Sequence, residues 1–84
     1  MTPKFFKNIE VDGEVLKFNF VRMFTVRGVV FFVGVVDKFL VTHKFRMEAT
    51  EGRWFINEPL KVPEWIRAVE EQLSFAIIDR NPIP

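Results

Sequence analysis

The chain has 84 residues, with twelve Lys and Arg, eleven Asp and Glu, and a formal net charge of +1. This length allows one domain, and the near-neutral charge gives no whole-protein field that would direct the molecule to nucleic acid or to an acidic membrane. Cysteine is absent, which excludes disulfides, thiolate zinc sites and a cysteine nucleophile. We therefore expect a single domain over residues 1–84, held together by packing or by self-association.

The N-terminal part predicts a β-hairpin. Residues 4–11 alternate in polarity, and Lys7 interrupts the apolar face with a charge that discourages further strand pairing. Asp12-Gly13 supplies the positive φ angles of a type I′ turn. The predicted return strand covers 14–24, and its expected core face carries Arg22 together with Leu16, Phe18, Phe20 and Phe24.

The segment 28–36 contains no polar side chain and is closed by Arg27 and Asp37. Its length and its Val and Phe content indicate a strand, and it is too short to span a membrane as a helix. Strand alternation divides its side chains into one set, Val29, Phe31, Val33 and Val35, and an opposite set, Val30, Phe32 and Val36. A helix can cover one face, so the other must meet another sheet, a curled part of the same sheet or another molecule.

Two further strands follow. Residues 39–48 alternate, with the inward set predicted as Phe39, Val41, His43, Phe45 and Met47. A turn at 50–52 leads to a short strand at 53–57, which carries Trp54 and Ile56 on one side and Phe55 on the other. Since consecutive strands tend to be neighbours, we expect an antiparallel β-meander of four to five strands over about 4–57.

A helix is predicted over 63–79, because Pro63 suits a first helical turn and the apolar residues recur at helical spacing. Its polar face is expected to hold Arg67, Glu70, Glu71 and Ser74, and Phe75 and Ile78 lie outside the apolar arc. Residues 81–84 are expected to form a tail after the helix. The predicted fold class is therefore α+β, an antiparallel β-meander with one C-terminal α-helix packed on one face.

Sequence motifs for catalysis are missing. His43, the single histidine, lies on an apolar strand face and is interpreted as a core residue with a hydrogen-bond partner, with a functional role as the alternative. Ser74 lacks a nucleophile-elbow context, and Gly28 and Gly34 do not form a phosphate-binding loop. Glu10, Asp12 and Glu14 do not match the calcium-binding loop. We expect no enzyme activity, no metal and no cofactor.

The leading functional hypothesis is a non-enzymatic interaction or structural domain that forms a homodimer through the sheet face or strand edge that its helix leaves uncovered. An unidentified protein is the second kind of partner expected. The residues predicted at this interface are Val30, Phe32, Val36, Phe75 and Ile78. We expect no membrane partner, and the absence of a recognisable signal peptide predicts a cytoplasmic location.

The alternative is a single-stranded nucleic-acid-binding module, in which Phe18 and Phe20 stack on bases. The cations predicted to meet phosphates are Lys17, Arg22, Arg27, Lys44, Arg46 and Arg53. A meander followed by one helix resembles, in layout only, the repeat unit of PUR-type nucleic-acid-binding domains, and neither a motif of that family nor an RNP-type sequence is present. A small-ligand pocket between sheet and helix is a third hypothesis, because apolar pockets look like cores in sequence.

Overall fold

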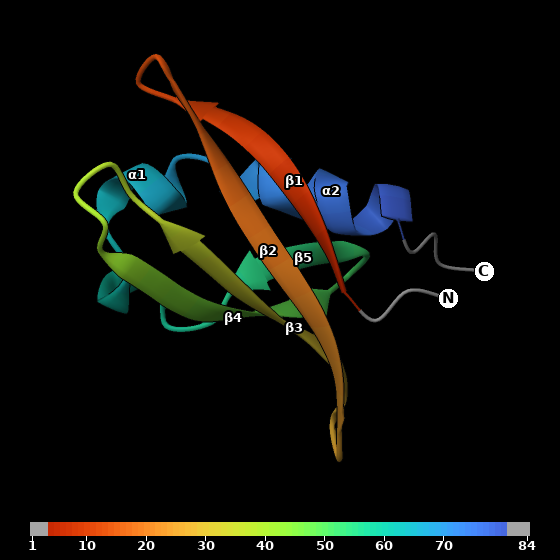
Figure 1. Cartoon of the computed structure of the whole chain (residues 1–84). Helices are drawn as coiled ribbons and strands as arrows, with labels where there is room; N and C mark the ends of the chain where they lie inside the picture. The colour runs from red at the N-terminus through yellow and green to blue at the C-terminus, as the bar shows by residue number, and fades with distance from the viewer. Residues whose placement is uncertain (1–3, 81–84) are drawn as a thin grey trace.

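The computed structural model describes residues 4–80 and has one five-stranded antiparallel sheet in the strand order of the sequence. The strands are β1 (Lys4–Val11), β2 (Glu14–Thr25), β3 (Gly28–Val36), β4 (Thr42–Thr50) and β5 (Arg53–Ile56). A 3₁₀ turn, η1 (Pro59–Lys61), leads to α1 (Glu64–Arg67) and α2 (Glu70–Arg80). The sheet curls around the helical segment, which lies across one face (Figure 1). The predicted α+β meander with a C-terminal helix is confirmed, and the predicted 81–84 tail lies outside the described residues.

Two of the strand connections are tight turns made by an acidic residue followed by glycine. Asp12 and Gly13 have φ angles of 49° and 83°, so the type I′ turn predicted for the first hairpin is confirmed. Glu51 and Gly52 repeat this geometry between β4 and β5, with φ angles of 53° and 81°. These turns fix the register of the first and last strand pairs.

The connection between β3 and β4 differs from the prediction. β4 begins at Thr42, so Phe39 and Val41, which were expected to face inward on a strand, are exposed in a longer turn. The reason is the Asp37 side chain, whose Oδ1 accepts hydrogen bonds from the backbone N–H of Phe39 at 2.8 Å and of Val41 at 3.0 Å. The carboxylate satisfies the turn amides that a strand ladder would otherwise have paired.

The predicted continuous helix over 63–79 is interrupted. α1 ends at Arg67, and α2 begins at Glu70. In the connection, the Val69 N–H donates to the Ile66 carbonyl at 3.1 Å, an i to i−3 bond that tightens the turn. This tighter turn keeps Ile66, Val69 and Leu73 buried against the sheet.

The core lies between the sheet and the helical segment. Phe18 and Phe20 face inward as predicted, and Phe20 stacks on Phe5 with ring centroids 4.5 Å apart. Phe24, which was predicted on the same core face, is exposed near the end of the long β2–β3 hairpin, where it lies beside the Arg22 guanidinium. The other core residues are Ile9, Phe31, Val33, Val35, Phe45, Met47, Trp54, Ile56, Val62, Ile66, Val69, Leu73, Ala76 and Ile77.

Side chains of α2 cover the outer edge of β5. The Trp54 N–H donates to Ser74 Oγ at 3.0 Å, and the Ile56 N–H donates to Glu70 Oε2 at 2.9 Å. Ser74 was predicted on a solvated polar face, which is wrong because its side chain is buried. Glu70 and Ser74 are one helical turn apart, so both reach the same strand edge, and unpaired amides there are satisfied by the helix.

Candidate functional site

The sheet face turned away from the helical segment, called the outer face from here on, is basic. Strand alternation and the pairing register place five cations on it, Lys4, Lys17, Lys44, Arg46 and Arg53. The same register places two carboxylates there, those of Glu10 and Glu48. The outer face therefore has three positive charges in excess, although the whole chain is close to neutral.

Three exposed phenylalanines form a diagonal line across the outer face. Phe6, Phe32 and Phe55 have 49%, 44% and 38% of their surface exposed. They occupy β1, β3 and β5, and the register places each of them one side-chain row further along the sheet than the previous one. With ordinary strand spacing and residue rise, successive members of this aromatic diagonal are about 12 Å apart.

Each ring of the aromatic diagonal has a cation beside it. Lys17 Nζ lies 4.3 Å from the centroid of the Phe6 ring, and Arg53 Cζ lies 5.4 Å from that of Phe55. Arg46 is paired directly with Phe32 in the β3–β4 register. The face therefore repeats one unit, a flat apolar ring next to a positive charge.

Two of these arginines have carboxylate neighbours. Arg46 Nε lies 3.2 Å from Glu48 Oε2, and Arg53 Nη2 lies 3.7 Å from Glu71 Oε2. These four side chains are between 37% and 69% exposed, and solvent-exposed pairs contribute about 0–1 kcal/mol. An incoming anion can therefore exchange with these carboxylates at small cost.

The structure divides the predicted interface residues between two surfaces. Phe32 and Val36 are exposed on the outer face, whereas Val30, on the same face, is 6% exposed and lies between Met23 and Glu48 in the register. The other two lie on α2, where Phe75 is exposed and Ile78 is partly buried against the core.

The predicted nucleic-acid residues are also divided. The outer face brings together Lys17, Lys44, Arg46 and Arg53. Arg22 faces inward and Arg27 lies in the turn between β2 and β3. The stacking role predicted for Phe18 and Phe20 is wrong, because both rings are fully buried.

Of the three rings exposed on the outer face, Phe32 was predicted as an interface residue, whereas Phe6 and Phe55 were not predicted as site residues. Phe6 and Phe55 lie next in sequence to the core residues Phe5, Trp54 and Ile56, and therefore on the opposite strand face. Strand alternation alone would have predicted both exposed rings, if it had been applied to every aromatic residue of the sheet.

His43 has a hydrogen-bond partner, as expected of a core histidine, although its side chain is only partly buried. His43 Nε2 lies 2.8 Å from Asp37 Oδ2, and the imidazole meets the Trp65 indole edge-on at 5.3 Å between ring centroids. This hydrogen bond, followed by that from the Val41 amide, lowers the pKa of the Asp37 carboxyl below its ordinary value. Across residues 4–80, no group of three or more His, Asp or Glu side chains is arranged to hold a metal ion.

Comparisons with protein-family models, with curated proteins and with solved structures find no match to this chain. In the described part of the chain, no helix is long and apolar enough to cross a membrane. The cytoplasmic location stays a prediction.

Proposed function

We propose that this chain is a non-enzymatic binding domain that holds single-stranded nucleic acid on its outer face. The observation that carries this proposal is the aromatic diagonal of Phe6, Phe32 and Phe55, each ring beside a cation. Unpaired bases stack on exposed aromatic rings, and Lys and Arg meet the phosphates between them. A duplex keeps its bases stacked inside, so this surface favours single strands.

The charge of the outer face favours nucleic acid as its partner over the outer face of a second copy of the chain. A twofold contact between two outer faces would bring the same five cations of each copy together. Two like charges 4 Å apart repel by about 1 kcal/mol in water and about 4 kcal/mol near a protein surface. Phosphates attract the same cations, so the repulsion is replaced by attraction. The extended backbone of a single strand can also follow the aromatic diagonal.

The proposal is tested by fluorescence anisotropy with a short labelled oligothymidylate at low salt, with a hairpin duplex of the same length as the competitor. We expect a preference for the single strand and an affinity that falls as salt rises, because bound phosphates release counterions. Phe32→Ala should weaken binding by about 1–3 kcal/mol, the typical loss for one stacked base.

Phe75→Ala is the matched control for Phe32→Ala, since it removes an exposed ring from α2 and should leave the affinity unchanged. Two results would contradict the proposal. One is no binding at low salt, and the other is an equal loss of affinity in both variants.

We propose self-association through the edge of β1 as a second candidate function. One edge of the sheet, at β5, is covered by Ser74 and Glu70, whereas β1 forms the opposite edge. A furrow beside β1 separates it from α2 and contains the exposed Phe75. Pairing of two β1 strands would continue the sheet and cover this ring, as edge strands do in many dimers.

Light scattering across a dilution series tests this second candidate. We expect a dimer mass that falls to the monomer mass on dilution, and a monomer at all concentrations after Phe75→Glu. Phe32→Glu is the comparison, because it places the same charge on the outer face instead. A wild-type monomer throughout, or dissociation by Phe32→Glu alone, would rule out the β1 edge.

A further inference from the structure

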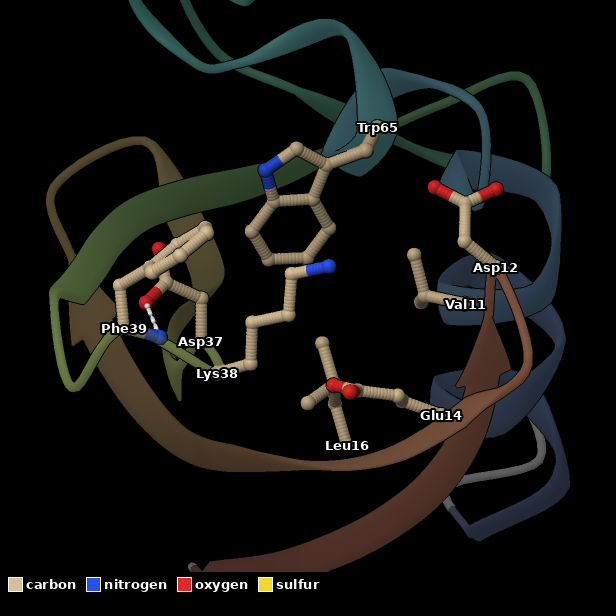
Figure 2. Close-up of a pocket in the computed structure, with 8 residues that line it drawn as sticks. All are labelled: Val11, Asp12, Glu14, Leu16, Asp37, Lys38, Phe39 and Trp65. Carbon is tan, nitrogen blue, oxygen red and sulfur yellow. Dashed lines mark hydrogen bonds between the residues drawn. The ribbon is translucent and has the colours of Figure 1, made fainter.

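A small pocket lies at the end of the molecule where the β1–β2 hairpin approaches α1 (Figure 2). Its volume is about 140 Å³, and its lining residues are Val11, Asp12, Glu14, Leu16, Asp37, Lys38, Phe39 and Trp65. A shallower hollow adjoins it, shares Val11, Asp12 and Trp65, and adds Glu10 and Glu64 to the surroundings. This Trp65 pocket lies apart from the aromatic diagonal, since none of its lining residues belongs to that line.

The walls of the Trp65 pocket are held in place by neighbours. The indole of Trp65 packs edge-on against both His43 and Phe18, at centroid distances of 5.3 and 6.4 Å. Asp37 fixes the turn that carries Phe39, since its carboxylate accepts hydrogen bonds from two turn amides and is paired with His43. Trp65 and the turn that carries Phe39 are therefore held in place by these contacts.

The rim of the Trp65 pocket is acidic. Within residues 4–80, the carboxylates of Asp12 and Glu14 form no ion pair, and neither does that of Glu64 in the adjoining hollow. Lys38 is the one cation among the residues that line the two hollows. Its side chain extends into the pocket toward Trp65 (Figure 2), with Nζ 5.4 Å from the centroid of the Phe39 ring.

We propose that the Trp65 pocket binds a small organic cation, an ammonium or guanidinium group on a short aliphatic chain. Apolar walls suit the methylene chain, an aromatic ring attracts the positive group, and the rim carboxylates complement its charge. The volume is well below the roughly 300–1,000 Å³ of pockets for drug-sized ligands, which restricts the occupant to the size of one side chain. Without a ligand, the ammonium group of Lys38 occupies the place of the ligand's positive group, and a bound ligand displaces the Lys38 side chain.

The test follows the Trp65 indole N–H in ¹H–¹⁵N spectra while agmatine, a free guanidinium compound, is added. A parallel titration with N-acetyl-argininamide represents an arginine side chain of a partner protein, and isobutylamide is the neutral control. We expect a saturable shift with a cation and none with the amide. If agmatine binds more tightly, the natural ligand is a free small molecule. If N-acetyl-argininamide binds more tightly, the natural ligand is an arginine side chain of a partner protein.

Variants test the roles of the charges. Asp12→Asn and Glu14→Gln should each weaken cation binding about two- to fivefold, the range of an exposed charge pair. Lys38→Met should strengthen it, because the internal competitor is removed. Glu51→Gln, in the matching turn between β4 and β5, should leave it unchanged.

The same spectra report whether each variant is folded. Equal shifts with isobutylamide, no saturation with either cation, or an unchanged affinity in both Asp12→Asn and Glu14→Gln would overturn the proposal. A Lys38→Met variant with weaker cation binding would overturn the displacement step. Oligonucleotide binding to the outer face is measured separately, so either proposal can fail without the other.

Discussion

Replacing Phe31 with alanine is expected to lower the free energy of unfolding by about 3–5 kcal/mol, the usual cost of removing a buried ring. Phe31 is 1% exposed, and its ring meets Trp54 edge-on at 5.0 Å and Phe5 at 6.0 Å between centroids. The whole stability of a domain is about 5–15 kcal/mol, and short chains bury a smaller share of their surface than long ones. The variant should therefore be largely unfolded well below the unfolding temperature of the wild type.

Phe32→Ala is the control for this prediction, because it deletes the same ring from the next residue. Phe32 lies on the outer face and is exposed, so the loss of stability should stay within about 0.5 kcal/mol. Urea denaturation followed by circular dichroism measures both variants. Similar losses from the two would mean that the outer face is covered in solution.

Ser74→Ala should cost about 1–3 kcal/mol, although it removes a single oxygen atom. The hydroxyl accepts the hydrogen bond of the Trp54 N–H, and both Ser74 and Trp54 are buried, so the amide would lose its partner in a dry environment. Urea denaturation gives the energy. Hydrogen exchange at the Trp54 amide should become faster in the variant, which would show that the loss of stability comes from this hydrogen bond.

Changes at Glu70 provide the comparison for Ser74→Ala. Glu70→Gln keeps an oxygen acceptor for the Ile56 N–H and should change stability little. Glu70→Ala should cost less than Ser74→Ala, because the Glu70 contact is only partly buried and water can replace the carboxylate. If Ser74→Ala left both stability and exchange unchanged, the β5 edge would not depend on the helix.

Local patterns were enough to predict most of the sheet. Alternation separated the two faces of β3 without saying which of them the helix covers, and Asp12-Gly13 predicted the first hairpin, because both signals act between near neighbours in sequence. The turn before β4 was mispredicted, since the Asp37 carboxylate replaces strand pairing there. Ser74 was misplaced for a different reason, because its hydrogen-bond partner lies on a strand 20 residues away.

The binding surfaces were harder to predict than the fold. The net charge of +1 does not indicate a basic outer face, because carboxylates on the hairpin and the helices offset the cations of that face in the sum. Four of the six predicted phosphate-binding cations do gather there, among them Lys44 and Arg46, because alternation places them together. The Trp65 pocket had no local signal, since Val11, Asp37 and Trp65 meet only in the folded chain.

The cover that α2 provides for β5 also determines how large an edge-paired assembly can become. A filament needs two open edges on every copy, so that each added molecule leaves a new end for the next. In the sheet described here, β1 is the edge without such a cover. Pairing of two such edges uses up both, so growth by this route terminates at two copies and leaves no end from which a fibre could elongate.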